Sequence, residues 1–429
     1  MIVNFGFTNF GPIKEEQVLS FEADKSDHLE DYYVIKAGSF RLLKFALIYG
    51  ANASGKTTIL KGLDFLRQLV LEPVEKKTDP LDFQPFLFDP DSPQQSSQLS
   101  IDLIQNGIRY DYTVEFTKEA IISEQLDYYH PKKANVFKRT TNVEQQLTEI
   151  IFGSKIKKDK FATKTLKSNT LWNNTVLGGF LKTNVDIFEM KEVTDWFHTY
   201  LRSLIYSNSQ LETGISKMIE KNHAIKKGVI SILQKADLHI SDIIVETSNY
   251  GDFFDYIQNS FSVDKRALQD FVQNSDKYSP TKVKLAHTVA GQSYHLPIEE
   301  ESLGTQRYYV LAGLLAQLIS QSQVLPIDEL EASLHPDLFT QFILTYLVNS
   351  KNSQLLATTH NREILNDKDI FRNDAIWFTD KSADAATELY SLADFDSATV
   401  RDTTNVLNAY KSGKLRGIPN LGDYYLELD

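Results

Sequence analysis

The stretch Phe45-Ala-Leu-Ile-Tyr-Gly-Ala-Asn-Ala-Ser-Gly-Lys-Thr57 decides the fold of this 429-residue chain. Its apolar run from Phe45 to Tyr49 predicts a buried strand, and the residues from about Gly55 to Leu71 predict a helix. The loop between them contains glycines, so its backbone N–H groups can converge on an anion beside the positive end of the helix. A strand, such a loop and a helix in this order predict a phosphate-binding P-loop.

Residues of this loop have distinct expected roles. We expect Lys56 to reach the β and γ phosphates of a nucleotide. We expect Thr57 to hold Mg²⁺ through its hydroxyl, because this ion prefers oxygen ligands. A P-loop alone does not separate kinases, GTPases and ATPases. The expected nucleotide contacts are Gly50, Asn52, Ala53, Ser54, Gly55, Lys56, Thr57 and Thr58.

A second motif lies far downstream, in Val324-Leu-Pro-Ile-Asp-Glu-Leu-Glu-Ala-Ser-Leu-His-Pro336. A short apolar strand ends here in two adjacent acids, with Pro326 interrupting it. We expect Asp328 to organise the Mg²⁺ shell and Glu329 to polarise the attacking water. Taken alone, two acids at the end of a strand could also simply face solvent. Pro336 fits the first position of a following helix.

Two further segments fit the same nucleotide site. In Gln354-Leu-Leu-Ala-Thr-Thr-His360, an apolar strand ends in a histidine that could hydrogen-bond the γ phosphate or the water. In Glu301-Ser-Leu-Gly-Thr-Gln-Arg307, Ser302 and Gly304 open an apolar helix and predict a second anion-binding helix end. If it lies on the opposite side of the subunit from the P-loop, this second end would serve the P-loop of a partner.

Periodicity along the chain predicts two sheet-containing segments that flank a helical insertion. Residues 1–130 predict a mixed sheet with few helices. From about Thr141 to Leu238 the pattern is helical, with Val193, Trp196, Phe197, Tyr200, Leu201 and Leu204 on one helix face. Strands return from Val283, and a last helix is expected near Ala398–Tyr410. We therefore predict an α/β fold with domains at 1–140, 141–238 and 239–429.

Composition limits the possible function classes. With 42% hydrophobic and 24% charged residues, the chain can bury a large core. There is no cysteine, which excludes disulfides and thiolate metal sites. A net charge of −12 argues against a surface covered with basic residues. There is neither an apolar run near the roughly 20 residues of a membrane span nor a signal peptide, so we expect a cytoplasmic protein without a membrane partner.

These motifs carry a resemblance to a known group. Their order resembles the ABC-type ATPases of the SMC and RecF group, and is most similar to the bacterial AAA-domain ATP-binding proteins called RloA, AbiLi and AriA. The opening Phe7-Thr-Asn-Phe-Gly-Pro-Ile13 looks like that group's first strand and turn. The C-terminal blocks look similar too, and they are Ala375–Phe378, Glu388–Leu392 and Lys411–Pro419.

What the resemblance implies is an ABC-type ATPase head that binds ATP and Mg²⁺ and hydrolyses ATP. Lys56 and Thr57 match Walker A, and Asp328 and Glu329 match Walker B. The remaining matches are Ser302 and Gly304 with the signature that acts in trans, Ser333 to His335 with the D-loop, and His360 with the switch histidine. Thr305 and Gln306 depart from the signature's usual charged residues, and Gln84 is a candidate for the Q-loop.

The resemblance also implies a cellular role. Members of the RloA, AbiLi and AriA group are implicated in defence against phage, so the chain is expected to be a sensor or scaffold. Its expected partners are a second copy or a higher homo-oligomer, a separately encoded effector and a phage-derived trigger.

Two alternatives remain open. One is a RecF-like or SMC-like ATPase that clamps DNA, with phosphate contacts from Lys155, Lys157, Lys158, Lys160, Lys164 and Lys167, although lysine runs are usually solvated surface. The other is a small-molecule P-loop kinase. A kinase needs neither a signature serine nor a switch histidine, which argues against this second alternative.

Overall fold

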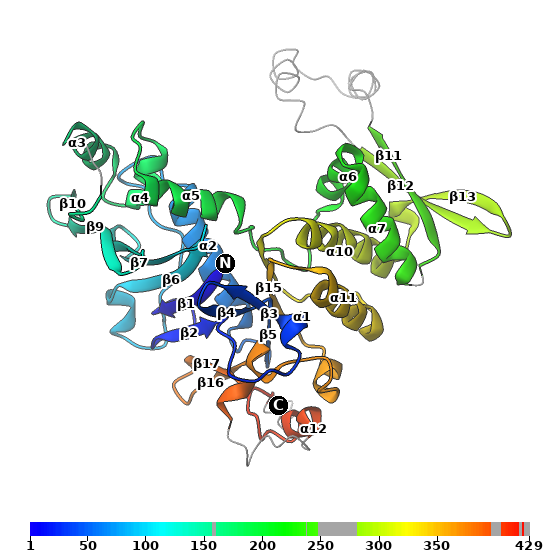
Figure 1. Cartoon of the computed structure of the whole chain (residues 1–429). Coiled ribbons are helices and arrows are strands. Elements are labelled where there is room, and N and C mark those ends of the chain that lie inside the picture. Colours follow the sequence, from blue (N-terminus) through cyan, green and yellow to red (C-terminus); the bar gives the residue numbers. More distant parts are fainter. Residues whose placement is uncertain (157–159, 237, 248–280, 396–404, 420–422, 424–429) are drawn as a thin grey trace, which may run out of the picture. The chain divides into compact units, whose positions relative to one another are not determined.

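The computed structural model describes residues 1–156, 160–236, 238–247, 281–395, 405–419 and 423 (Figure 1). Contacts divide the chain into two compact units. Unit 1 comprises Met1–Ser207, Gln321–Leu330 and Leu347–Asp429, and unit 2 comprises Asn208–Ser320 and Glu331–Tyr346. The predicted domain boundaries after residues 140 and 238 stay predictions.

An antiparallel sheet of unit 1 contains most of the N-terminal strands, in the order β10-β9-β8-β7-β6-β1-β2. Its strands alternate buried and exposed residues, as in β7, where Tyr110, Tyr112 and Val114 are buried. The bounds are β1 Ile2–Thr8, β2 Gln17–Ser20, β6 Ser97–Gln105, β7 Ile108–Phe116, β8 Ile121–Tyr129, β9 Lys133–Asn142 and β10 Leu147–Phe152.

A second sheet of unit 1 joins the two ends of the chain, in the order β14-β15-β5-β16-β17. Strands β14, β15, β5 and β16 are parallel, and β17 is antiparallel to β16. The predicted α/β class is confirmed. The expectation of a single mixed sheet for residues 1–130 is wrong, because β5 pairs with β15 and β16 instead. The bounds are β5 Phe45–Gly50, β14 Val324–Ile327, β15 Gln354–Thr358, β16 Ile376–Lys381 and β17 Thr387–Ser391.

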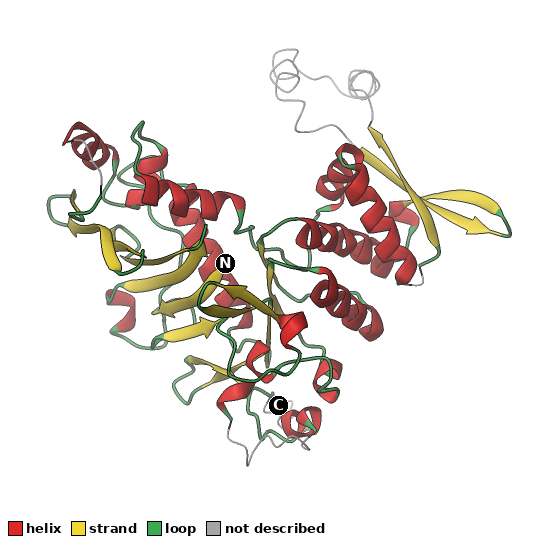
Figure 2. Ribbon diagram, in the orientation of Figure 1, coloured by secondary structure: helices red, strands yellow, loops and turns green. Residues whose placement is uncertain are grey.

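Helix α2 (Lys56–Leu71) follows β5 directly and is buried along much of its length. Gly62 lies against Phe5 of β1 and Leu99 of β6, where an added Cβ would be 3.6 Å and 3.7 Å from their side chains. The helix also contacts β5 and β15. It therefore packs between the two sheets of unit 1, and its N-terminus closely follows the carboxyl end of β5. Figure 2 distinguishes the helices from the strands in the orientation of Figure 1.

The predicted helical region differs from the structure in two places. Strand β10 occupies Leu147–Phe152, where a helix was expected, and pairs with β9. Helix α5 (Phe188–Thr199) carries Val193, Trp196 and Phe197 in the core but ends before Leu201. Residues after α5 turn to the edge of β14, where the N–H of Arg202 donates to the carbonyl of Val324 (2.9 Å). Strand pairing therefore replaces the last predicted helical turn.

Pro326 does not interrupt its strand, contrary to the sequence expectation. Backbone groups alternate in direction along β14, so residues 325 and 327 face β15 while residue 326 faces the segment after α5. The carbonyl of Pro326 accepts from the N–H of Ile205 (3.0 Å). Because β14 lies at the edge of its sheet, the missing N–H of proline removes no hydrogen bond to β15.

In unit 2, helices pack on a small antiparallel sheet in the order β11-β12-β13. Strands were expected only from Val283, but β11 begins at Ile240. The bounds are α6 Glu212–Lys221, α7 His223–Lys235, β11 Ile240–Thr247, β12 Thr281–Val289, β13 Gln292–Pro297, α10 Leu303–Ser320 and α11 Pro336–Asn349, whose last residues belong to unit 1.

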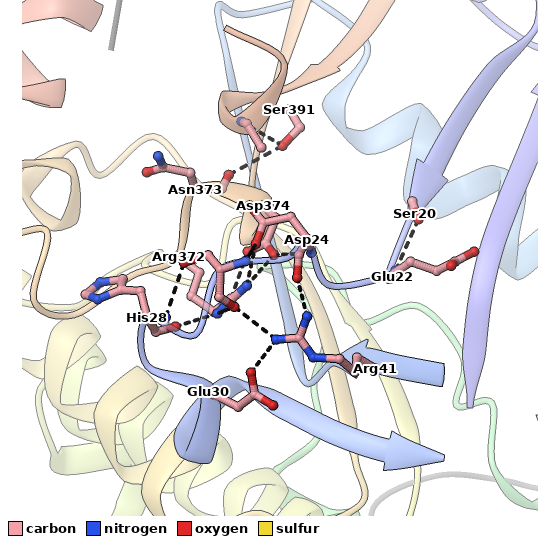
Figure 3. A network of polar contacts seen from close by, with 12 residues as sticks. Ser20, Glu22, Asp24, His28, Glu30, Arg41, Arg372, Asn373, Asp374 and Ser391 are labelled. Atoms are coloured by element: carbon pink, nitrogen blue, oxygen red, sulfur yellow. Dashed lines mark hydrogen bonds and ion pairs between the residues drawn. The ribbon is translucent and has the colours of Figure 1, made fainter. Parts of the chain in front are cut away.

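A buried arginine links two distant segments of unit 1. The Arg372 guanidinium donates to both carboxylate oxygens of Asp374 (3.0 and 2.7 Å) and to Asp24 (2.8 Å). It also donates to the carbonyl oxygens of Ser26 and His28 (Figure 3). These contacts hold the loop before α1 (Glu30–Tyr33) against the turn that leads into β16.

The remaining described elements are short. No helix in the described ranges is long and apolar enough to cross a membrane. The helix expected near 398–410 is present as α12 (Val406–Lys411), and residues 398–404 lie outside the described residues. Other bounds are α3 Lys160–Asn169, α4 Val176–Leu181, β3 Val34–Ala37 and β4 Phe40–Leu43.

Candidate functional site

The P-loop connects β5 to α2 in unit 1. Lys56, which is only 6% exposed, donates from Nζ to the carbonyl oxygens of Gly50 and Ala51 (3.0 Å each). Gly55 caps α2 with a φ of 105°, in the region that favours glycine. Ala53 adopts a φ of 60°, which is uncommon for a residue with a side chain and is typical of functional loops.

Two threonines of neighbouring strands brace this loop. The hydroxyls of Ser54 and Thr379 lie 2.6 Å apart, and Thr387 donates to the carbonyl of Ser54 (2.8 Å). A Cβ on Gly50 would lie 2.5 Å from the Ser54 hydroxyl, so glycine is required by this close approach. Strands β16 and β17 thus hold the loop from the side opposite β15.

The expected Mg²⁺ residues lie next to each other. Thr57 donates from its hydroxyl to the two carboxylate oxygens of Asp328 (3.1 and 3.0 Å). Thr358, at the end of β15, donates to the same carboxylate (2.6 Å). A hydroxyl and a carboxylate oxygen side by side are a donor set that fits Mg²⁺, which completes its shell with phosphate oxygens and water.

Glu329 follows directly and adopts a φ of 49°, in the left-handed region. Its N–H donates to the Thr358 hydroxyl (2.8 Å), and its carboxylate accepts from Ser207 (3.0 Å). Thr358 therefore positions both acids: it donates to Asp328 and accepts from the backbone of Glu329. The assigned roles of Asp328 and Glu329 stay predictions, which this arrangement supports.

His360 is exposed at the carboxyl end of β15, and its backbone neighbour Thr359 donates to the carbonyl of Ile48 (3.1 Å). It lines a cavity of about 690 Å³ together with Gly50, Ala51 and Asn52 of the P-loop. A histidine at this place could reach the terminal phosphate of a bound nucleotide, so its predicted role is compatible with the geometry.

The Q-loop candidate lies on another side of the P-loop helix. Gln84 lines a cavity of about 400 Å³ with Thr58 and Lys61 of α2. Its side-chain oxygen accepts from Lys118 (3.0 Å), and its carbonyl accepts from the N–H of Gly11 (2.7 Å). Gln84 is therefore near the nucleotide loop in the fold, although far from it in the sequence.

The residues that were predicted to form the signature belong to unit 2. Ser302 caps α10, accepting through its hydroxyl from the N–H of Thr305 (3.1 Å). Gly304 approaches the D-loop, because a Cβ there would lie 3.1 Å from the carbonyl oxygen of Ser333. Ser302, Gly304 and Ser333 are thus brought together in unit 2, whereas the P-loop, Asp328, Glu329 and His360 lie in unit 1.

Sequence reasoning missed several residues of the site. Thr358, Thr379, Thr387 and Ser207 were not singled out, because a buried threonine gives no pattern of its own. The position of Thr358 beside His360, at the end of the same strand, was the available signal. Of the lysines proposed to contact DNA, Lys157 and Lys158 lie outside the described residues, as does the side chain of Lys160.

Comparison with known proteins places this site in a family. Residues 45–366 match the model of the family described as "AAA domain, putative AbiEii toxin, Type IV TA system". This segment contains the P-loop, the signature, both acids and His360. No curated protein matches the chain.

Solved structures resemble the chain in fold alone. The SMC head domain from Thermotoga maritima is 11% identical, with a TM-score of 0.41, covering 91% of this chain and 98% of that one. An SmcHead bound to the C-winged helix domain of ScpA is 12% identical, with a TM-score of 0.47, covering 91% and 97%.

Proposed function

The chain belongs to that AAA-domain family, and from this membership we propose that it binds and hydrolyses ATP as an ABC-type ATPase. The observation that carries the proposal is the hydrogen-bonded chain from Thr57 through Asp328 to Thr358 and Glu329. It joins the end of the P-loop to two acids from a different strand. Bound phosphates, Mg²⁺ and an attacking water would need these groups next to one another.

Each residue has a distinct role in the proposed reaction. Lys56 would turn from the loop carbonyls to the β and γ phosphates, and Thr57 and Asp328 would hold Mg²⁺, which would offset phosphate charge. Glu329 accepts a hydrogen bond from the attacking water and orients it, and His360 donates to the terminal phosphate. Ser207 and Thr358 keep Glu329 in place.

We further propose that two copies form a sandwich around two nucleotides. Ser302 and the first N–H groups of α10 are the donors that would bind an anion at this helix end, and Gly304 lets the end approach Ser333 of the predicted D-loop closely. In the proposed dimer, this end of one subunit contacts the nucleotide on the P-loop of the other.

The test combines hydrolysis with the mass in solution. Wild-type protein should release phosphate from Mg-ATP, while Glu329→Gln should retain ATP and accumulate as a dimer in light scattering. Ser302→Arg should oppose the dimer by placing bulk at the helix end, and Glu363→Gln, at an exposed position, serves as a control. A monomeric Glu329→Gln variant under saturating Mg-ATP would refute the sandwich.

For the cellular role, we propose a sensor or scaffold in a bacterial anti-phage defence system that controls a separate effector. The resemblance to RloA, AbiLi and AriA supports this role, and the family's description refers to a toxin–antitoxin system. The test is phage challenge of cells that carry this gene with and without its neighbours. The role is supported if protection against phage is lost both when a neighbouring gene is removed and when Lys56 is replaced. ATP hydrolysis stimulated by duplex DNA, without protection, would favour the RecF-like alternative.

A further inference from the structure

The cavity beside the P-loop extends beyond the residues that the nucleotide motifs explain. Gly50 and Asn52 form one part of its lining, and Thr359 and His360 form another. A third part comes from two basic side chains, Arg362 and Lys381, which belong to no recognised motif. All of these residues lie in unit 1.

The fold sets Lys381 close to the start of the P-loop. Strand β16 pairs in parallel with β5, with Thr379 opposite Gly50, so Lys381 lies two residues further along β16, beyond the end of β5. Its Nζ donates to the carbonyl of Ala385 (2.8 Å). Burial lowers the pKa of Lys381, which indicates an amine that is partly withdrawn from water.

Arg362 enters the cavity from the segment after β15. Its guanidinium carbon lies 5.9 Å from the centre of the Tyr410 ring, within the range of a cation–π contact. Tyr410 is itself held, because its hydroxyl donates to the carbonyl of Gly417 (2.9 Å). The aromatic ring can thus orient the guanidinium without neutralising its charge.

Carboxylates do not balance these two cations. Asp380 also lines the cavity, but it accepts from Arg416 Nε at 3.0 Å. In the part of the chain that the structure describes, neither Arg362 nor Lys381 forms an ion pair. Two positive charges at the rim of a phosphate-binding loop, without acidic partners among these residues, favour an anionic ligand.

We propose that Arg362 and Lys381 form a subsite for the terminal phosphate of a nucleoside triphosphate, through which the protein distinguishes ATP from ADP. This inference rests on the proposed ATPase function. His360 and the first residues of the P-loop line the same cavity, so Arg362 and Lys381 lie beside the residue that is proposed to contact the terminal phosphate. Arginine supplies several fixed donors, and lysine supplies a point charge.

The test is calorimetric titration of the full chain with Mg-ADP and with the Mg-bound, non-hydrolysable imido analogue of ATP. For Arg362→Ala/Lys381→Ala, affinity for the ATP analogue should fall at least about tenfold, with ADP affinity within about twofold. Lys132→Ala/Lys138→Ala removes the same charge from exposed positions next to and within β9, outside the cavity, and both affinities should stay within about twofold.

The outcomes separate this subsite from the ATPase proposal. An equal loss for both nucleotides, or no loss for the ATP analogue, overturns the subsite. A wild-type protein that binds neither nucleotide overturns the ATPase proposal itself. If the double variant does not fold by circular dichroism, the single variant Arg362→Ala decides, since this side chain is exposed. The preference of the Arg362→Ala variant for the ATP analogue over ADP should fall. The Arg362→Lys variant should recover part of this preference.

Discussion

Lys56 is a buried cation that donates to the carbonyl oxygens of Gly50 and Ala51 in the P-loop. A bound nucleotide would offer phosphate oxygens in place of these carbonyls. An ammonium group is attracted more strongly to a negatively charged phosphate oxygen than to a neutral carbonyl oxygen, so the lysine should turn to the phosphates. The contacts of Lys56 with these carbonyl oxygens therefore stabilise the loop until a nucleotide binds and replaces them.

Replacement of Lys56 by Ala should therefore weaken ATP binding. We expect an affinity loss of at least about tenfold, or about 1.4 kcal/mol, in calorimetric titration. Lys138→Ala, which removes an exposed lysine on β9, is the matched control and should bind normally. Unchanged affinity in the Lys56 variant would show that the loop is not a nucleotide site.

Thr358 offers a second test at the level of one hydroxyl. Thr358→Val keeps the shape of the side chain but removes its hydrogen bonds to Asp328 and Glu329. Because supporting residues of this kind commonly contribute 10- to 100-fold, we expect kcat to fall by about that factor, with a smaller change in nucleotide affinity. Thr141→Val removes a hydroxyl far along the antiparallel sheet and should leave kcat unchanged. A loss of affinity alone would contradict a positioning role.

Among the elements, β16 contributes at both of its ends. Its carboxyl end braces the P-loop through Thr379 and supplies Lys381 to the cavity. The turn before it carries Arg372 and Asp374, which bind the loop around Asp24. A single strand thus connects the phosphate site to the N-terminal part of unit 1.

Loss of the Arg372 contacts should destabilise unit 1. Arg372→Ala leaves the carboxylate of Asp374 buried without its partner, and breaking a buried pair in this way costs about 3 kcal/mol or more. Arg416→Ala removes the exposed pairs with Asp380 and Glu388, and should cost about 1 kcal/mol or less. Urea denaturation measures both free energies of unfolding. Equal losses of the free energy of unfolding in the two variants would show that the buried contacts of Arg372 stabilise the unit no more than the exposed pairs of Arg416.

On the scale of the whole molecule, the C-terminal strands complete the sheet that carries the P-loop. Strands β16 and β17 extend the sheet beyond β5, and α12 and the residues after it contribute Tyr410, Ile418 and Pro419 to the wall of the P-loop cavity. This segment therefore forms part of the candidate nucleotide site.

We predict that the chain has no nuclease or other toxic activity of its own and acts through another protein, although the family's description names a toxin. The acids of α5, such as Glu189, Glu192 and Asp195, fit a solvated helix face better than a metal site. The pure protein with Mg-ATP or Mn-ATP should leave plasmid DNA, phage DNA and tRNA intact. Cleavage only after addition of a neighbouring gene product would support the prediction, and robust cleavage by the pure chain would refute it.

Sequence by itself determined the local parts of this protein. The P-loop strand and helix, the strand that ends in Asp328 and the strand that ends in His360 are contiguous patterns, so periodicity and turn chemistry predict them. Local patterns were misleading where a distant strand competed. The residues after α5 continue a helical pattern but pair with β14 instead, because the edge of that strand offers unpaired backbone groups.

Tertiary structure alone decided which of these parts meet. Parallel pairing of β14 with β15 and of β15 with β5 brings Thr57, Asp328 and Thr358 within hydrogen-bonding distance. Parallel pairing of β5 with β16 sets Lys381 beside the P-loop. Such pairing joins residues hundreds of positions apart, and each hydrogen bond depends on strand order and register. Neither order nor register is written in the periodicity of a single strand, since any buried apolar run can pair with any other.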